Sequence, residues 1–192
     1  MSLFQILMLA ATAFFAYKIY EFVQNMEDPA TARDRMPPDA PEDAGTESLV
    51  DEADAAFGSG DLARARTLLM EADVRSPDTP EILNKLGFIL AQEGETDHAL
   101  ERYLRSLELD DGDDLVHNAL ASLYRKQGNF EAARRHYDAA LAIDDAYEVT
   151  YFNYGNLLTE TGENEAAKAM YAKALEIKPD FMQAKFELEK LQ

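Results

Sequence analysis

The three histidines are the side chains of this sequence best suited to bind a transition metal, because the chain contains no cysteine. A metal site on a helix requires two ligands on one face, typically at positions i and i+4. His98, His117 and His136 fall at different points of the expected helices, and no helix carries two of them. The sequence therefore predicts no metal site.

The acidic run at residues 110–114 resembles a calcium loop only at first sight. Aligning its glycine with the glycine of an EF-hand places Leu107 and Leu109 at the first and third ligand positions, where oxygen ligands are required. We therefore predict a turn, in which Asp113 or Asp114 accepts a hydrogen bond from the free backbone N–H groups that begin the next helix.

Motifs of enzymes are missing from the sequence: it has no glycine-rich phosphate loop, no nucleophile elbow and no paired-carboxylate pattern. The formal net charge is −19, of which −15 falls in residues 46–192. A domain with this much negative charge repels nucleic acid. Motifs and charge therefore predict a protein that is not an enzyme, uses no cofactor or small-molecule substrate, and binds no nucleic acid.

A period of 34 residues organises most of the chain. Residues 114–147 form one complete unit, in which Gly128 and Asn129 separate two amphipathic helices. The glycine position of that turn holds Gly60, Gly94, Gly128 and Gly162, and five residues later stand Ala65, Ala99, Ala133 and Ala167. No insertion disturbs this spacing, so the sequence predicts four consecutive helix-turn-helix units.

Small and large residues recur at the positions that closely packed helices require. Small residues are expected where helices cross, and on the first helices these are Ala53, Gly87, Ala121 and Gly155. Larger residues, expected to fill the space between consecutive units, are Leu69, Tyr103, Tyr137 and Tyr171 on the second helices. One short hairpin cannot bury its own apolar face, so neighbouring units must stack into a continuous core.

This pattern resembles the tetratricopeptide repeat, whose 34-residue unit has an aromatic residue, Leu-Gly and Tyr on its first helix and Ala, Phe and Pro later. The fourth unit matches most closely, with Tyr151, Gly155 and Pro179 at family positions, whereas the third has His117 at the first aromatic position and Asp145 in place of the proline. The resemblance implies an all-α, right-handed α-solenoid. Its expected units are 46–79, 80–113, 114–147 and 148–181, followed by a capping helix over 182–192.

The resemblance also implies where a partner protein or peptide would bind. In the family the first helices line a concave groove, and the selected positions here are Asn84, Phe88, Asn118, Ser122, Arg125, Phe152 and Asn156. Amides offer a donor and an acceptor to a peptide backbone, the rings offer apolar contacts, and Arg125 offers a positive point for an acidic or amphipathic segment. The alternative is that the amides are ordinary surface residues and the rings complete packing between units.

One specificity known in the family is not expected here. Members that clamp the C-terminal carboxylate of heat-shock chaperones use Lys and Asn on the first unit, where this sequence has Val50 and Asp54. A carboxylate would meet Asp54 instead of a cation, so the sequence predicts that a chaperone tail is not bound.

Residues 1–24 are predicted to form a single transmembrane helix. The apolar stretch Leu3 to Val23 would extend about 31 Å as a helix, close to the hydrocarbon thickness of a bilayer, and Lys18 could reach the interface. A cleaved signal peptide and a packing helix are the alternatives. Four prolines among acidic and small residues indicate that 25–45 is a disordered, Pro-rich acidic linker.

The charges around this segment favour a cytoplasmic repeat domain. Lys18, Arg33 and Arg35 follow the span and only the terminal amine precedes it, and positive charge is retained on the cytoplasmic side. A periplasmic domain is the alternative. The pattern predicts a single-pass protein of the bacterial inner membrane that acts as a scaffold or adaptor for a membrane-associated complex. A chaperone-like holder of unfolded or exported chains is the second hypothesis, and a self-assembling coat is the third.

We expect the N-terminal segment to remain in the mature protein, because it lacks the basic n-region of a cleaved signal peptide. Intact-mass spectrometry of the protein extracted from membranes should therefore give the mass of the full-length chain. A chain that begins near Phe14 would show cleavage and contradict the predicted anchor.

Overall fold

The computed structural model describes residues 44–192, and the predicted transmembrane helix and most of the predicted linker lie outside this range. Within it the chain forms nine α-helices and no strand. Residues 45–192 make up one compact unit. None of the helices described here is long and apolar enough to cross a membrane.

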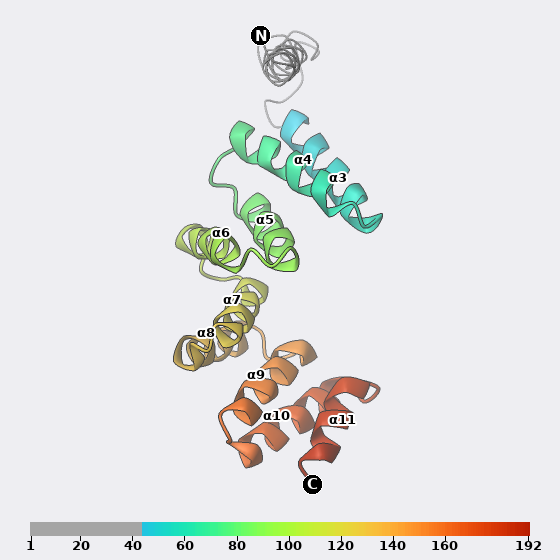
Figure 1. The fold of residues 1–192 in the computed structure, drawn as a ribbon, viewed down its shortest axis with the longest axis vertical. Coiled ribbons are helices and arrows are strands. Elements are labelled where there is room, and N and C mark those ends of the chain that lie inside the picture. The colour runs from blue at the N-terminus through green and yellow to red at the C-terminus, as the bar shows by residue number, and fades with distance from the viewer. Residues whose placement is uncertain (1–43) are drawn as a thin grey trace, which may run out of the picture. The chain divides into compact units, whose positions relative to one another are not determined.

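The helices follow one another as four hairpins and one final helix (Figure 1). The hairpins are α3 (Ala44–Gly58) with α4 (Leu62–Arg75), α5 (Pro80–Gln92) with α6 (Thr96–Leu109), α7 (Asp114–Lys126) with α8 (Phe130–Ile143), and α9 (Glu148–Glu160) with α10 (Asn164–Ile177). The final helix is α11 (Met182–Lys190). The predicted all-α solenoid of four helical hairpins is therefore confirmed, although α3 begins two residues before the predicted first unit.

The backbone conformation at each turn explains the repeated glycine. Gly60, Gly94, Gly128 and Gly162 have φ between 76° and 83°, in the left-handed region that a residue with a side chain rarely adopts. This conformation ends the first helix of every hairpin. In two turns the next residue then caps the second helix, because the side chains of Asp61 and Asn129 accept hydrogen bonds from its first turn.

The acidic run is a turn between the second and third hairpins, as the sequence predicts. Oδ1 of Asp113 accepts a hydrogen bond from the backbone N–H of Val116 at 3.0 Å and so caps α7. The backbone N–H of Gly112 donates to Oδ1 of Asp110 at the same distance. Among the residues that the structure describes, no cluster of three or more His, Asp or Glu side chains could hold a metal ion.

Tyrosines lie directly over glycines where the two helices of a hairpin meet. A Cβ atom added at Gly87 would be 2.9 Å from the ring of Tyr103, and one added at Gly155 would be 2.5 Å from the ring of Tyr171. The glycines therefore make room for large rings from their own hairpin. The predicted packing between consecutive units is also present, since Tyr103 shares a buried cluster with Val116 and Leu120 of the next hairpin.

Buried clusters join consecutive hairpins into a continuous core. Ala53 of α3, Leu69 of α4 and Ile82 of α5 belong to one cluster. The ring of Tyr137 in α8 stacks on Tyr154 in α9, with centroids 5.3 Å apart. These clusters lie in the compact unit of residues 45–192, so this part of the chain has its own hydrophobic core, which a domain needs in order to fold alone.

Helix α11 covers the end of the fourth hairpin. Ala184 is fully buried in a cluster with Tyr151 and Ala174, and Leu188 and Leu191 pack against the cluster that spans the third and fourth hairpins. The helix lies within residues 182–192, where the sequence predicts a capping helix. The cap hides apolar surface that a terminal repeat would otherwise expose to water.

We expect Ala133→Leu to destabilise the 44–192 fragment by about 1–3 kcal/mol, because overpacking a filled core forces side chains and backbone to shift. Ala133 is fully buried, in a cluster with Ala121 and Tyr137. Thermal denaturation followed by circular dichroism measures the effect. Lys126→Ala, on the exposed face of the same hairpin, is the control; equal changes in Tm would mean that the assigned packing is wrong.

Candidate functional site

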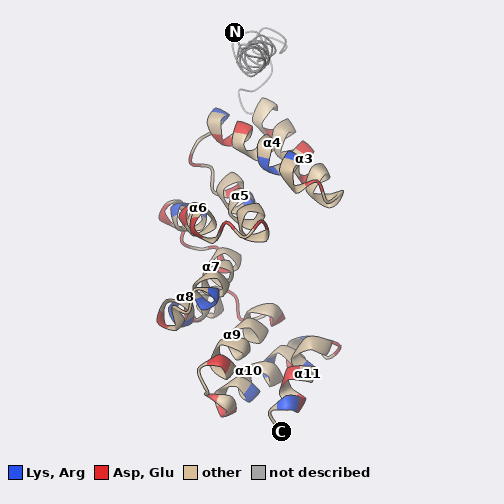
Figure 2. Ribbon diagram, in the orientation of Figure 1, with Lys and Arg blue, Asp and Glu red and all other residues tan. Residues whose placement is uncertain are grey.

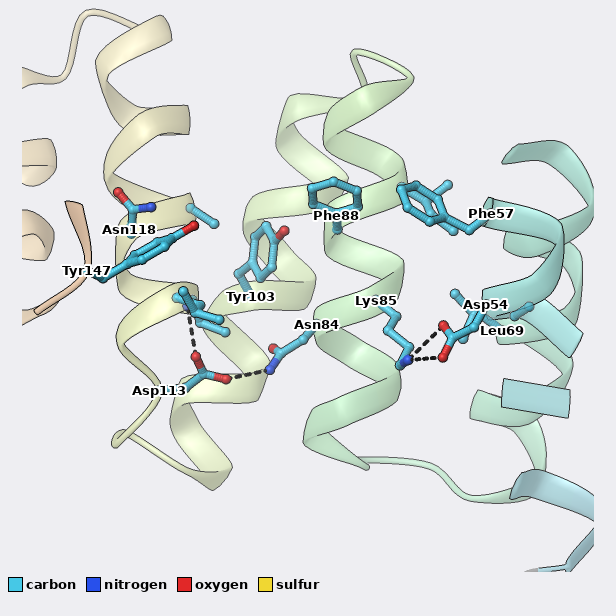
Figure 3. Close-up of a pocket in the computed structure, with 15 residues that line it drawn as sticks. Asp54, Phe57, Leu69, Asn84, Lys85, Phe88, Tyr103, Asp113, Asn118 and Tyr147 are labelled. Carbon is cyan, nitrogen blue, oxygen red and sulfur yellow. Dashed lines mark hydrogen bonds and ion pairs between the residues drawn. The ribbon is translucent and has the colours of Figure 1, made fainter. Parts of the chain in front are cut away.

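A pocket of about 570 Å³ opens on the first three hairpins. Most of its lining comes from α3, α5 and α7, the first helices of their hairpins, and α5 contacts α7 directly. Single residues from α4, α6 and the turns complete the wall (Figure 3). The stacking of repeats therefore creates a hollow that no single hairpin contains.

Large apolar side chains face this pocket and remain accessible to solvent. Phe57 and Phe88 lie edge to face, with ring centroids 5.4 Å apart, and are 41% and 42% exposed. Leu115 also lines the pocket and is 55% exposed. Three large exposed apolar residues around one hollow offer apolar surface that a bound segment can cover.

A hydrogen-bonded amide and carboxylate form the polar side of the pocket. Nδ2 of Asn84 donates to Oδ2 of Asp113 at 2.9 Å (Figure 3). This bond orients the amide, so the Asn84 oxygen is the atom left over, and it is buried without a hydrogen-bond partner among the described residues. A buried acceptor without a partner favours an incoming donor.

The cation of the pocket is held by a carboxylate. Nζ of Lys85 lies 2.7 Å and 2.6 Å from the two carboxylate oxygens of Asp54 and 3.5 Å from Glu81. Burial lowers the pKa of Lys85, but its hydrogen bond to Asp54 and the charges of both carboxylates outweigh burial and raise that pKa above its ordinary value. Lys85 therefore stays protonated, and its charge is balanced within the wall.

Three of the seven predicted site residues meet in this pocket: Asn84, Phe88 and Asn118. Oδ1 of Asn118 also accepts a hydrogen bond from Nδ2 of Asn153 in α9, at 3.2 Å. The amide of Asn118 is therefore partly engaged by the next repeat.

Ser122 and Asn156 lie outside the pocket lining and bond to tyrosines of their own hairpins. Oγ of Ser122 is 3.1 Å from the hydroxyl of Tyr137, and the hydroxyl of Tyr171 donates to Oδ1 of Asn156 at 2.9 Å. Both side chains thus connect the first helix of a hairpin to its second.

Arg125 and Phe152 also lie outside the pocket lining. Nη1 of Arg125 donates to the carboxylate of Glu160 in the next repeat. The ring of Phe152 packs against Tyr171 and Phe181, with centroids 6.0 Å and 5.1 Å apart. Arg125 is therefore ion-paired, and contact between these two residues and a partner stays a prediction.

Comparison with family models assigns the repeats. A model of the tetratricopeptide repeat matches residues 78–146 and 113–180, and a second model of the same repeat matches 47–69. The chain belongs to the tetratricopeptide repeat family. Comparison with curated proteins found no match.

Several solved structures share the fold. A MamA protein from Desulfovibrio magneticus RS-1 is 18% identical, with 77% of this chain and 84% of that chain covered and a TM-score of 0.70. YrrB, described as having an unusual peptide-binding site, is 19% identical over 75% and 74% of the two chains, with a TM-score of 0.67. The first repeat domain of Spaghetti (RPAP3), bound to the HSP90 peptide SRMEEVD, is 25% identical over 58% and 89%, with a TM-score of 0.57.

Several residues of the pocket were not selected from the sequence. Phe57 stands two repeat periods before Arg125, at a position that the family pattern assigns to the groove, so the tetratricopeptide register could have identified it. Asp113 and Tyr147 stand one period apart, at the last position of their units. That position lies just before the first helix of the next unit, and only the folded structure shows that its side chain lines the pocket.

Two histidines that the sequence places on different helices meet inside the third repeat. Nδ1 of His117 in α7 lies 3.0 Å from Nδ1 of His136 in α8, and the ring of His136 stacks on Tyr124 with centroids 5.5 Å apart. Burial, followed by the charges of His117 and Arg135, lowers the pKa of His136 to about 4. His136 is therefore neutral at pH 7.

We expect this pair to make the third repeat sensitive to acid. The folded-state pKa of His136 lies below the unfolded value near 6.5, so the unfolded state binds more protons and stability falls as the pH drops from about 6.5 toward about 4. Thermal denaturation of wild type and His136→Phe across this range tests the effect.

The His136→Phe variant keeps an aromatic ring against Tyr124 and cannot be protonated. As the pH drops from about 6.5 toward about 4, its Tm should therefore fall less than that of the wild type. His98→Gln, at an exposed histidine of α6, is the matched control and should follow the wild type. Identical pH profiles for wild type and His136→Phe would contradict the prediction.

Proposed function

We propose that this protein is a scaffold or adaptor that holds a segment of a partner protein in the pocket of its first three repeats. The observation that carries the proposal is the group of exposed apolar side chains, Phe57, Phe88 and Leu115, gathered on one hollow beside the Asn84 amide. Binding sites for peptides combine apolar surface with a few oriented polar groups in this way.

The relatives support a protein partner. YrrB has a peptide-binding site, and the first repeat domain of RPAP3 is bound to a peptide. Tetratricopeptide repeats are typically non-enzymatic interaction modules, and the function proposed here requires binding without catalysis.

Within the pocket we assign direct contact with the partner to Asn84, Phe88 and Asn118. The other four predicted residues lie outside the pocket lining, and their side chains contact other parts of the solenoid: Ser122, Arg125, Phe152 and Asn156. Releasing those contacts would cost free energy that a bound segment must replace. We therefore propose that these four residues hold the helices of the solenoid together and leave recognition to the pocket of the first three repeats.

We further propose that Leu3 to Val23 anchors the protein in the bacterial inner membrane, with the repeats in the cytoplasm. The length and apolar character of this segment support an anchor, and the basic residues that follow it support the orientation. The linker at 25–45 would hold the solenoid away from the lipid surface. The anchor would bring a bound partner to the membrane and so help to organise a membrane-associated complex.

We expect Phe88→Ala to reduce recovery of the partner by about fivefold or more, because truncating a central aromatic contact removes much of the binding energy. Tagged full-length protein, cross-linked in its own cells and quantified by mass spectrometry, provides the measurement. Phe186→Ala is the matched control, since Phe186 is 60% exposed on α11 and lies outside the pocket.

Both variants should keep the helicity and Tm of the wild type. Loss of one or two abundant partners with Phe88→Ala alone would support the adaptor. A loss spread evenly over many clients would favour the chaperone-like holder instead. Unchanged recovery with both variants would show that partners use another surface and would contradict the proposed site.

A further inference from the structure

The negative charge of the solenoid is concentrated in its first two repeats. Residues 46–113 contain 17 acidic residues and six Lys or Arg, a net charge of −11, whereas residues 114–192 contain 13 acidic residues and nine Lys or Arg, a net charge of −4. Figure 2 marks both kinds of residue along the ribbon. Since most of the pocket lining lies in 46–113, a partner that approaches the pocket meets the more acidic half.

The cations of this half are already paired. Each of the six Lys and Arg residues in 46–113, a range that the structure describes completely, has a carboxylate oxygen 2.6–3.6 Å away. Arg66, for example, contacts both Glu93 and Glu95. An acidic partner would have to displace one of these carboxylates before it could form an ion pair here.

The pocket itself carries a carboxylate, Asp113, that pairs with no cation among residues 44–192. Asp113 accepts hydrogen bonds from the amide of Asn84 and the backbone N–H of Val116, and both donors are neutral. Lys85, which is the cation that the described residues contribute to the lining, is held by Asp54. Together with the buried acceptor of Asn84, this leaves a polar wall that offers acceptors and negative charge beside the apolar surface.

We propose that the segment held in this pocket is apolar and basic. Large apolar side chains lie against Phe57 and Phe88, and a Lys or Arg lies beside Asp113 and the oxygen of Asn84. This inference rests on the proposed function and specifies its partner. It also separates this chain from the RPAP3 domain, whose bound peptide SRMEEVD contains three acidic residues.

Two synthetic peptides of about 12 residues test the inference. Both carry the same Leu and Phe residues, and they differ only in having Lys or Glu at the same intervening positions. Fluorescence anisotropy with the 44–192 fragment, at an ionic strength of about 0.15 M, measures Kd for each. We expect the Lys peptide to bind about tenfold more tightly or better, since opposite charge attracts and like charge repels across an interface.

Three variants test which residues cause the preference for the Lys peptide. Asp113→Asn removes the charge but keeps an equally good helix cap, and should weaken binding of the Lys peptide about threefold or more. Glu101→Gln removes the same charge from an exposed position of α6 outside the pocket, and should change Kd less than about twofold. Phe88→Ala should weaken binding of the Lys peptide and confirm that the peptide occupies the pocket.

The outcomes separate this inference from the function on which it rests. If the Glu peptide binds as tightly as the Lys peptide and Phe88→Ala weakens both, the pocket binds peptides and the inferred charge is wrong. If Asp113→Asn and Glu101→Gln weaken binding equally, the peptide is attracted by the net charge of the whole domain and not by Asp113, and the inference fails. If neither peptide depends on Phe88, the proposed binding function of the pocket fails as well.

Discussion

The close approach of the two helices in each hairpin is the constraint on which the structure depends. In the second and fourth repeats a tyrosine ring lies too close to Gly87 or Gly155 to leave room for a Cβ atom there. The third repeat places Tyr137 in the same register against a small residue, Ala121, within one buried cluster. Because this contact recurs every 34 residues, successive first helices present equivalent faces, and a continuous wall results.

Ion pairs between repeats then hold the wall in register. Arg66 of α4 bonds to Glu95 before α6, and Arg134 of α8 bonds to Glu163 before α10, two repeat periods later. Each pair joins the second helix of one hairpin to the turn of the next. The first half of the solenoid has more carboxylates than cations, and pairs of this kind engage its cations, so the contacts between repeats influence the charge that a partner meets.

The N-terminal and C-terminal halves of the wall differ in how much aromatic surface remains exposed for a partner. Phe57 and Phe88 contact each other but remain about two-fifths exposed, because little else covers them. Phe152 instead packs against Phe181, which precedes the capping helix, and against the cluster that contains Ala184 of that helix. The cap that closes the end of the core therefore also occupies part of the fourth repeat, and the open surface lies over the first three.

The sequence by itself determined the hairpins, their turns and the cap, because these depend on local backbone preferences and on a period that appears directly in the residue types. A left-handed glycine at position 128 or a small residue at position 133 is required whatever the neighbouring repeat contains. The use of each wall residue was decided only by the tertiary structure. Arg125 bonds to Glu160, which is 35 residues away, and His117 contacts His136, which is 19 residues away. Stacking of the repeats and crossing of the helices bring these side chains together, and their separation in the sequence does not predict the contact.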